Sequence, residues 1–328
     1  MAAPLAGKFA LVTGASRGVG RGIALQLGQA GATVLITGRA PAQSFSATHT
    51  DFVHLPSLEQ TKRDIESRGG KAVAIYCDHS EPAEVEKLFE KVGTITGDRL
   101  DILVNNAFSA VSELNSSSGR PFYELEPSMW DAFNNVGLRN HYYCAVYACR
   151  IMAKRKSGLV VNISSLAGLA YAFNVAYGCE SVAIDRMAAD MAVELKGTGV
   201  SIVSLWLGGV KTETAQVFLS SEHATDSVLS TDVANATLID GESTEFAGKC
   251  IAALAADAKV HNKSGKVLFS SDLAREYGFR DIDGKMPLHA RSLQLALKLT
   301  GSSRAATWTP ACIRIPKSFL HFASYKFD

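Results

Sequence analysis

The sequence has few of the features that mark secreted, membrane-spanning or nucleic-acid-binding proteins. Its six cysteines are scattered and include no C-x-x-C pair and no spacing typical of a metal site. No apolar run reaches the length of a membrane span, and a net charge of +1 gives no general attraction for nucleic acid. These absences predict an intracellular, cytoplasmic protein with reduced cysteines, no bound metal and no nucleic-acid partner.

Apolar residues are abundant and fall into short runs. They make up 47% of the 328 positions, which is enough for a large core. The length allows two domains, although a doubly wound α/β fold often occupies it as one. Besides a first strand near the N-terminus, the apolar runs predict strands at residues 33–38, 72–77, 100–104, 158–163, 201–207 and 266–269.

A glycine-rich turn near the N-terminus separates a strand pattern from a helix pattern. Phe9, Leu11 and Val12 predict a buried strand, residues 13–20 (TGASRGVG) interrupt it, and helical spacing of apolar residues begins at Val19. Backbone N–H groups at a helix start are unpaired, and glycines let a ligand approach the backbone closely. The order strand, turn, helix therefore predicts a pyrophosphate site, with an ordinary tight turn as the alternative.

The spacing Gly14-x3-Gly18-x-Gly20 resembles the T-G-x3-G-x-G of the short-chain dehydrogenases/reductases, a superfamily of single-domain Rossmann enzymes. The resemblance covers about residues 5–275, which we take as one domain from residue 1 to 275, and residues 276–328 form a C-terminal extension. It implies a doubly wound, mainly parallel sheet with helices on both faces. It also implies cofactor contacts from the loop residues Gly14, Ser16, Arg17, Gly18, Val19 and Gly20.

Arg39 directly follows the second predicted strand, nineteen residues after Gly20. An acidic residue at this place would hold the ribose 2′-OH of NAD, whereas an arginine neutralises a 2′-phosphate. The resemblance gives Arg17 the same role. Either arginine alone could be a solvated surface charge, but two of them without a competing carboxylate predict NADP(H) as the cofactor.

Three further cofactor contacts come from the resemblance. Asp78 ends the third predicted strand and would contact the adenine, or cap the helix that follows it, or do both. Residues 105–108 (NNAF) resemble the family's N-N-A-G, so Asn106 would brace the central strands and Ala107 would approach the adenine ribose. Phe108 stands where the family has glycine.

The catalytic residues are also assigned through the resemblance. A carbonyl that receives hydride becomes an alkoxide, so its oxygen needs a hydrogen-bond donor and a proton. Ser165 would supply the first, and Tyr177, twelve residues further on, the second. Asn135, on a helix expected over residues 128–152 with Ser128 as its cap, would hold a water in the proton relay. Alternatively it is a polar helix residue bonded to a neighbouring backbone group.

The match fails four residues after Tyr177. The family has a lysine there, which lowers the pKa of the tyrosine from its reference value near 10 and grips the nicotinamide ribose. This chain has Ser181, which can bond the ribose but carries no charge. Glu180 lies three residues after Tyr177 on the same side of a helix, so it would raise the tyrosine pKa if it leaned inward. Arg186 points to the opposite face and cannot replace the lysine.

Several loops complete the expected site. Residues 208–213 (GGVKTE) resemble a family loop, so that Thr212 would bond the nicotinamide carboxamide and Val210 would contact the cofactor. We expect this loop to be looser because Leu207 replaces a proline. Residues 109–127 predict a lid and residues 214–240 a mobile substrate loop. Residues 40–56 predict an exposed loop.

The C-terminal segment 308–327 mixes aromatic and aliphatic residues with arginine and lysine, and two prolines exclude one long helix. It is expected either to pack over its own domain or a dimer mate, or to touch a membrane surface such as that of the endoplasmic reticulum. A homo-oligomer is also expected.

Together these assignments predict an oxidoreductase that transfers hydride between NADP(H) and a small carbonyl or alcohol, for which the resemblance suggests steroid or xenobiotic carbonyls. The alternative is a cofactor-binding protein with impaired catalysis that acts as a sensor or dimer partner. Ser181 is the residue that separates the two hypotheses.

Overall fold

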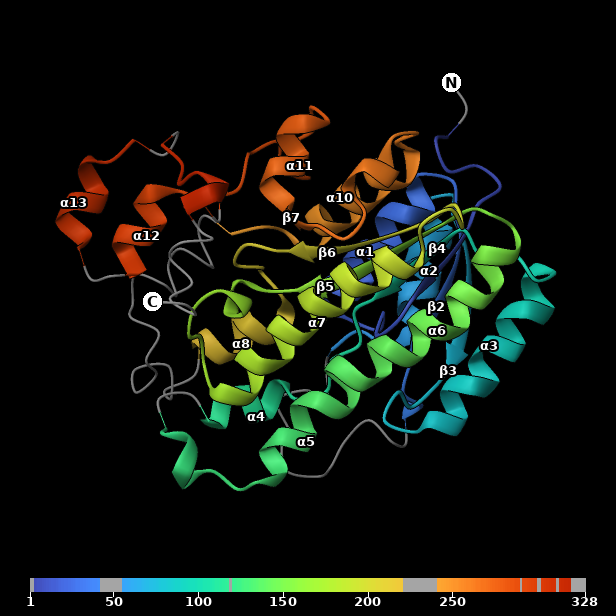
Figure 1. Cartoon of the computed structure of the whole chain (residues 1–328), viewed down its shortest axis with the longest axis horizontal. Helices are drawn as coiled ribbons and strands as arrows, with labels where there is room; N and C mark the ends of the chain where they lie inside the picture. Colours follow the sequence, from blue (N-terminus) through green and yellow to red (C-terminus); the bar gives the residue numbers. More distant parts are fainter. Residues whose placement is uncertain are drawn as a thin grey trace.

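One parallel sheet organises the chain (Figure 1). The computed structural model describes residues 3–41, 55–117, 120–220, 241–289, 291–299, 302–310 and 313–319. Within them, seven strands pair in the order β3-β2-β1-β4-β5-β6-β7, and every pairing is parallel. The strands are β1 (Phe9–Val12), β2 (Thr33–Gly38), β3 (Lys71–Tyr76), β4 (Ile102–Asn105), β5 (Gly158–Ser164), β6 (Val200–Trp206) and β7 (Val267–Phe269).

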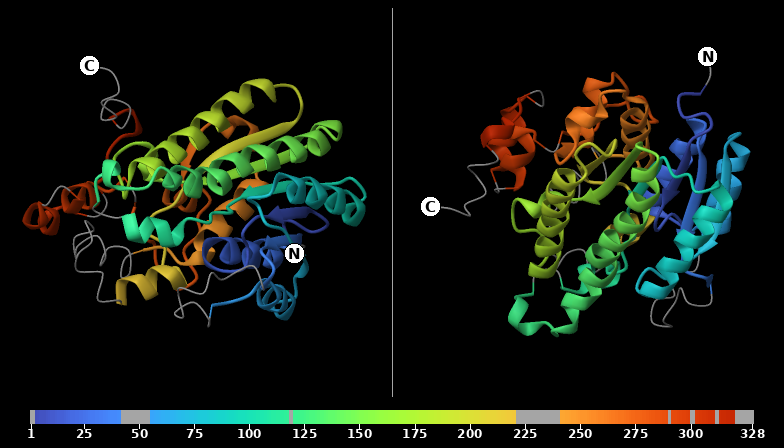
Figure 2. Two further views of the ribbon diagram at one scale, coloured as in Figure 1. Left: turned by 90° about the horizontal axis from the view of Figure 1, so that it is seen from below. Right: turned by 45° about the vertical axis from the view of Figure 1, so that its right-hand side comes forward.

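Helices cover both faces of this sheet, as Figures 1 and 2 show. The helices α1, α2, α10 and α11 pack on one face, and α3, α6 and α7 pack on the other. The described α-helices are α1 (Gly18–Gln29), α2 (Leu58–Ser67), α3 (Pro82–Thr96), α4 (Val111–Ser117), α5 (Ser128–Asn134), α6 (Asn140–Lys154), α7 (Val175–Glu194), α8 (Glu213–Ser220), α10 (Thr244–Ala256), α11 (Ser270–Glu276), α12 (Leu293–Leu299) and α13 (Ser303–Trp308).

The strands read as continuous apolar runs because both faces of the sheet are buried. On β1, Leu11 faces the layer of α3, α6 and α7, whereas Ala10 and Val12 face the layer of α1 and α10. All three side chains have no exposed surface. The doubly wound, parallel fold expected from the sequence is thus confirmed.

The strand order reverses at β1, which lies between β2 and β4. From β1 the chain runs outward through β2 to β3, and it then returns to the other side of β1 to form β4. Ligands of open α/β sheets bind outside the carboxyl ends of the strands at such a switch point. The glycine-rich turn follows β1 and the segment 105–108 follows β4, so both lie at this place.

Two expected helix caps are wrong. Asp78 does not cap α3, which begins at Pro82 with Glu81 as its N-cap residue. The ring of Pro82 fixes a backbone φ that suits the first helical position, where no backbone N–H is required. Pro82 therefore sets the start of the helix. Ser128 is likewise inside α5, whose N-cap residue is Pro127 and makes no side-chain cap bond.

The single helix expected over residues 128–152 is divided. α5 ends at Asn134, a five-residue π-helical segment, η4 (Asn135–Arg139), follows, and α6 continues to Lys154. π-helical turns are rare and occur often at functional sites. The expected lid at 109–127 contains α4 and a short 3₁₀ turn at Phe122–Glu124. The expected loop at 214–240 starts as α8, while its residues 221–240 lie outside the described part, as do residues 42–54 of the expected exposed loop.

The C-terminal extension is attached to α11 through one carboxylate. Asp272 lies 2.7 Å from His289, 2.8 Å from Arg291, 3.7 Å from Arg314 and 3.2 Å from Lys317. These contacts fix His289, Arg291, Arg314 and Lys317 of the extension on α11. Residues 320–328 lie outside the described part, so the membrane hypothesis for the tail stays an expectation. None of the described helices is long and apolar enough to cross a bilayer.

Candidate active site

The glycine-rich turn approaches β4 so closely that it tolerates no side chain at two positions. Gly14 has a φ of +66°, and a Cβ there would lie 2.8 Å from the Cα of Ala107. A Cβ on Gly20 would lie 2.3 Å from the carbonyl oxygen of Gly14. The first glycine therefore permits the contact with β4, and the third permits the helix α1 to start directly under the turn.

Thr13 and Asn106 join the carboxyl ends of the two central strands. The Thr13 hydroxyl oxygen accepts hydrogen bonds from the backbone N–H groups of Asn106 at 2.9 Å and Ala107 at 3.0 Å. The Asn106 side-chain amide donates to the carbonyl oxygens of Thr13 at 2.9 Å and Gly14 at 3.1 Å. This double connection fixes the floor of the crevice at the switch point.

Arg17 and Arg39 are brought to one place at the rim of this crevice. The pKa of Arg17 is lowered by burial and by the nearby positive charge of Arg39, while Glu213 opposes that effect. Two guanidinium groups thus lie near each other on the segments that follow β1 and β2.

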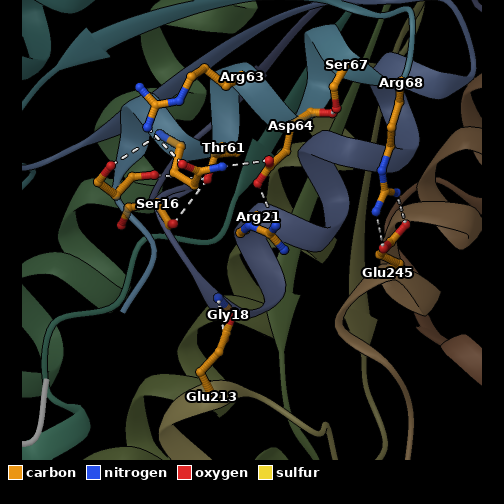
Figure 3. A network of polar contacts seen from close by, with 12 residues as sticks. Ser16, Gly18, Arg21, Thr61, Arg63, Asp64, Ser67, Arg68, Glu213 and Glu245 are labelled. Carbon is orange, nitrogen blue, oxygen red and sulfur yellow. Dashed lines mark hydrogen bonds and ion pairs between the residues drawn. The ribbon is translucent and has the colours of Figure 1, made fainter. Parts of the chain in front are cut away.

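A carboxylate already occupies one donor of the glycine-rich turn (Figure 3). The backbone N–H of Gly18 donates to Glu213 Oε2 at 3.0 Å. Figure 3 also shows how α2 supports the turn: Thr61 donates to the Ser16 carbonyl at 3.1 Å, and Arg21 pairs with Asp64 at 2.7 Å. The turn is therefore held from one side by α2 and is touched from the other by the start of α8.

Asp78 lies in a turn of its own after β3. Its carboxylate accepts from the backbone N–H of Ser80 at 2.9 Å and from the Ser80 hydroxyl at 2.8 Å. Its own N–H donates to Glu84 at 2.7 Å. The side chain thus shapes the loop after β3, and its second oxygen is the one left for a ligand.

Tyr177 lies in the first turn of α7, inside a group of aromatic rings. Its ring centroid is 5.5 Å from that of Phe173, 6.1 Å from that of Phe133 and 6.2 Å from that of Phe108. Phe173 has a φ of +62°, a left-handed conformation that is strained for a bulky side chain. Asn174 caps the helix by accepting from the Tyr177 N–H at 2.9 Å. The residue that replaces the family's glycine, Phe108, is one of the three rings.

The environment of the Tyr177 hydroxyl favours the phenol over the phenolate. Burial raises the pKa of Tyr177, the hydrogen bond with Ser165 lowers it, and Glu180 raises it when its carboxyl is ionised. The sequence indicated that Glu180 would have this effect if it leaned inward. It does lean inward, since only 4% of its surface is exposed.

Ser181 contacts Ser165. Their hydroxyl oxygens lie 2.9 Å apart and share a hydrogen bond, and the Ser165 hydroxyl also accepts from the Ala167 N–H at 3.2 Å. Ser181 is 2% exposed. The position expected for a lysine is therefore a small, neutral, buried hydroxyl beside the residue assigned to polarise the substrate carbonyl.

Asn135 opens the π-helical segment η4 and is half-buried. The residue of this segment that meets α7 is Gly137. A Cβ built on Gly137 would lie 1.6 Å from Oε1 of Glu180, so the carboxyl fills the space beside this glycine. The structure thus places η4 against the turn of α7 that follows Tyr177, and the relay role of Asn135 stays a prediction.

The loop after β6 is held by Glu242 in place of the missing proline. The Gly208 N–H donates to Glu242 Oε1 at 2.9 Å, the Glu242 N–H donates to the Gly209 carbonyl at 2.7 Å, and the Lys211 N–H donates to the Glu242 carbonyl at 2.9 Å. Val210 forms a parallel bridge with Glu242. These bonds restrain a loop that the sequence predicted to be loose.

Thr212 ends this loop and begins the next helix. Its hydroxyl oxygen accepts from the Ala215 N–H at 3.1 Å, as an N-cap of α8 does. Thr212 also lies next to Gly18 of the glycine-rich turn. Thr212 is therefore placed between the two loops that frame the crevice.

Three features of the site escaped the sequence analysis, namely the Glu242 restraint, the Glu213 contact and the Gly137 slot. A glycine in the middle of an apolar helix pattern was the one local signal for the slot, because glycine is costly there unless packing requires it. Glu242 and Glu213 bond residues that lie 34 and 195 positions away in the sequence, so no local pattern predicts these contacts.

Comparisons with known proteins agree with this geometry. Residues 8–223 match the family model described as short chain dehydrogenase. Dehydrogenase/reductase SDR family member 1 from Homo sapiens and its counterpart from Mus musculus are each 44% identical to this chain over 328 residues, which is 100% of both chains. NADPH-dependent aldehyde reductase 2, a chloroplastic protein of Arabidopsis thaliana, is 30% identical over 66% of this chain and 78% of its own.

Solved structures share the fold. A metagenomic short-chain oxidoreductase in complex with NADP aligns with a TM-score of 0.60 at 26% identity, over 81% of this chain and 97% of its own. A short-chain type dehydrogenase/reductase from Mycobacterium marinum aligns with a TM-score of 0.64 at 22% identity, over 81% of this chain and 94% of its own. The second likeness bears on the fold alone.

Proposed function

Since the chain belongs to the short-chain dehydrogenase/reductase family, whose members are oxidoreductases with nicotinamide cofactors, we propose that it transfers hydride between NADP(H) and a carbonyl or alcohol. The observation that carries this proposal is that Tyr177 is hydrogen-bonded to Ser165, while its ring lies 6.2 Å from that of Phe108, the residue after Ala107, which the glycine-rich turn approaches. This supports a hydrogen-bonding hydroxyl and a proton donor that act together near the carboxyl ends of the strands.

The cofactor preference rests on the two arginines. Arg17 and Arg39 are close enough for their charges to interact, and the described carboxylate near them, Glu213, bonds a backbone N–H of the turn. One structural relative was solved with NADP, and one relative from Arabidopsis thaliana is named as NADPH-dependent. We assign the remaining contacts to the residues that border the crevice, namely Gly14, Ser16, Gly18, Val19, Gly20, Asp78, Asn106, Ala107, Tyr177, Ser181, Val210 and Thr212.

When bound, the nicotinamide supplies the hydride in reduction or accepts it in oxidation. Ser165 donates a hydrogen bond to the carbonyl oxygen, where negative charge develops. Tyr177 gives its phenolic proton to that oxygen and takes it back in the reverse direction. Asn135 is assigned to hold a water that connects the site with solvent.

Ser181 makes this site weaker than one that contains a lysine. A neutral hydroxyl cannot lower the pKa of Tyr177, and the neighbouring carboxyl acts in the opposite direction. Carbonyl reduction uses the protonated tyrosine and suffers less than alcohol oxidation, which needs the phenolate. Slow turnover with carbonyl reduction as the better direction in neutral solution follows from this.

The rings around Tyr177 indicate the kind of substrate. Phe108, Phe133 and Phe173 place apolar surface next to the proton donor, so a carbonyl compound with an apolar body is favoured over a sugar or a charged acid.

The cofactor part of this proposal is tested by binding. Titration followed by protein fluorescence gives the dissociation constants of NADPH and NADH for the unmodified protein and for Arg39→Asp. We expect NADPH to bind more tightly to the unmodified protein and the preference to reverse in the variant. An exposed arginine on α6 provides the control Arg150→Asp, which should leave both constants unchanged. Equal affinities for the two cofactors would contradict the proposal.

A further inference from the structure

The carboxyl group of Glu180 lies in a slot that only a glycine can leave open. The residue is 4% exposed, and its Oε1 stands where a Cβ on Gly137 would be, at 1.6 Å. Its other oxygen, Oε2, is buried and makes no hydrogen bond to the described residues. The group is therefore enclosed between α7 and η4 with unused hydrogen-bonding capacity.

An enclosed carboxyl with an unpaired oxygen is costly to ionise. Among the described elements that pack on α7, η5 (Leu166–Gly168), β5 and β6 contain no charged residue. Two further elements pack on α7, and each carries one charged residue. On α5 this is Asp131, which is exposed. On η4 it is Arg139, whose guanidinium donates to the carbonyl of Ser80 at 2.6 Å. On α7 itself, Asp185 accepts a hydrogen bond from the indole N–H of Trp206 at 2.9 Å. On α6, burial lowers the pKa of His141 to about 4, so it is neutral.

Burial therefore raises the pKa of Glu180, to about 8. The group carries its proton in neutral solution and loses it in mildly alkaline solution. Ionised Glu180 in turn raises the pKa of Tyr177, which lies one helical turn before it on the same side of α7.

We propose that Glu180 is a positioning residue of the active site, a carboxyl enclosed in the slot of Gly137 whose ionised form keeps Tyr177 in its phenol form in alkaline solution. The proposal rests on the function proposed above, because Tyr177 matters only as the proton donor. Glu180 touches neither substrate nor cofactor in this account, and it acts through Tyr177.

The two groups titrate as a coupled pair. The first proton lost on raising the pH comes from Glu180, and the carboxylate left behind makes the second loss, from Tyr177, more difficult. In reduction, hydride forms the new C–H bond, the Tyr177 proton goes to the carbonyl oxygen, and solvent returns a proton to the phenolate. Glu180 thus extends carbonyl reduction toward alkaline pH and confines alcohol oxidation to still higher pH.

The test compares the unmodified protein with Glu180→Gln, which keeps the shape and removes the titration. The absorbance of tyrosinate is followed against pH in each background, and the same titration with Tyr177→Phe isolates the signal of Tyr177. Glu194→Gln, at the exposed end of the same helix, is the matched control. Glu180→Ala repeats the test if the glutamine variant does not fold.

We expect Glu180→Gln to lower the Tyr177 midpoint by roughly one pH unit, which is tenfold more phenolate at a given pH below it. The pH at which alcohol oxidation rises should move down by the same amount, and Glu194→Gln should change neither. An unchanged Tyr177 midpoint in a folded Glu180 variant would overturn the proposal. Absence of turnover in every variant would refute the proposed function, while the absorbance titration would still decide the role of Glu180.

Discussion

The hydroxyl oxygens of Ser165 and Ser181 lie 2.9 Å apart, and their hydrogen bond joins the end of β5 to the second turn of α7. The residue that stands in the lysine position thus contacts the serine to which we assign the substrate carbonyl. It orients the hydroxyl that is assigned to the substrate carbonyl, but it brings no positive charge to Tyr177. Binding of the cofactor and weak catalysis are both compatible with this arrangement.

Glu213 occupies a backbone donor of the glycine-rich turn that the proposed cofactor would also use. Its carboxylate accepts from the Gly18 N–H at 3.0 Å, a donor at the start of α1 where a pyrophosphate is favoured by the helix dipole (Figure 3). We expect Glu213→Gln to bind NADPH more tightly, by roughly three- to tenfold, because a negative charge is removed from beside the phosphates. Fluorescence titration measures this change. Glu86→Gln, exposed on α3, is the control, and weaker binding by Glu213→Gln would show that the carboxylate organises the turn instead.

Gly137 and Glu180 should be energetically coupled. Gly137→Ala places a methyl group 1.6 Å from the carboxyl oxygen, so we expect a loss of about 1–3 kcal/mol in the free energy of unfolding. In a Glu180→Ala background the same change should be neutral or stabilising, since alanine is the better helix former. Urea denaturation of the four proteins gives the coupling.

The control for this cycle is Gly178→Ala, because a Cβ on Gly178 would meet only the Ala167 carbonyl oxygen, at 3.7 Å. Its effect should be the same in both backgrounds. Strictly additive effects of Gly137→Ala and Glu180→Ala would mean that the two residues do not share the slot.

Stability should fall as the pH rises through the range in which Glu180 titrates. Burial raises its pKa from 4.5 to about 8, so between these values the folded chain holds a proton that the unfolded chain has lost. The contribution is complete below 4.5 and is lost as the pH approaches 8, at up to about 1.4 kcal/mol per pH unit. Urea denaturation across this window should show a smaller slope for Glu180→Gln than for the unmodified protein.

Glu242 also contributes to the pH dependence of the free energy of unfolding, but it does so equally in the unmodified protein and in Glu180→Gln. Its pKa is also raised, to about 7, mainly by burial, so it adds a loss of stability over part of the same range in both proteins. The difference between them therefore reports Glu180 alone. Identical slopes would show that the Glu180 carboxyl is not protonated in the folded chain.

Asp272 should act in the opposite direction at acid pH. Its hydrogen bonds and ion pairs with His289 and Arg291 hold the pKa of this carboxyl below its usual range. The stabilisation is present above 3.8 and is lost as the pH falls through the lowered value. We expect Asp272→Asn to release the extension, so that limited proteolysis in neutral solution cuts after residue 289 sooner than in the unmodified protein. An unchanged cleavage rate would show that other contacts hold the extension.

Local patterns were sufficient for the parts of the molecule that depend on neighbouring residues. The strand of Phe9–Val12, the turn at Gly14 and the helix from Gly18 follow from apolar spacing and from the spacing of the glycines. The cap at Asp78 was wrong because the helix begins only at Pro82, four residues further on.

Other parts depend on how distant elements meet, which no local pattern encodes. That Glu180 leans inward was one of several possibilities, and it became definite only when η4 was placed against α7 with a glycine at 137. The restraint of Gly208 by Glu242 joins two residues that are 34 positions apart in the sequence. The π-helical start of η4 at Asn135 was also hidden, because its residues continue an ordinary helix pattern.

The central claim is that Tyr177 donates the proton in a site weakened by Ser181. Steady-state oxidation of NADPH against a panel of apolar ketones, quinones and steroids tests it most directly, with the unmodified protein beside Ser181→Lys and Tyr177→Phe. The account predicts slow turnover that rises in Ser181→Lys, by a part of the roughly 10²–10⁴-fold that general acid–base catalysis contributes, and that disappears in Tyr177→Phe. Brisk turnover that survives Tyr177→Phe, or none even in Ser181→Lys, would contradict it.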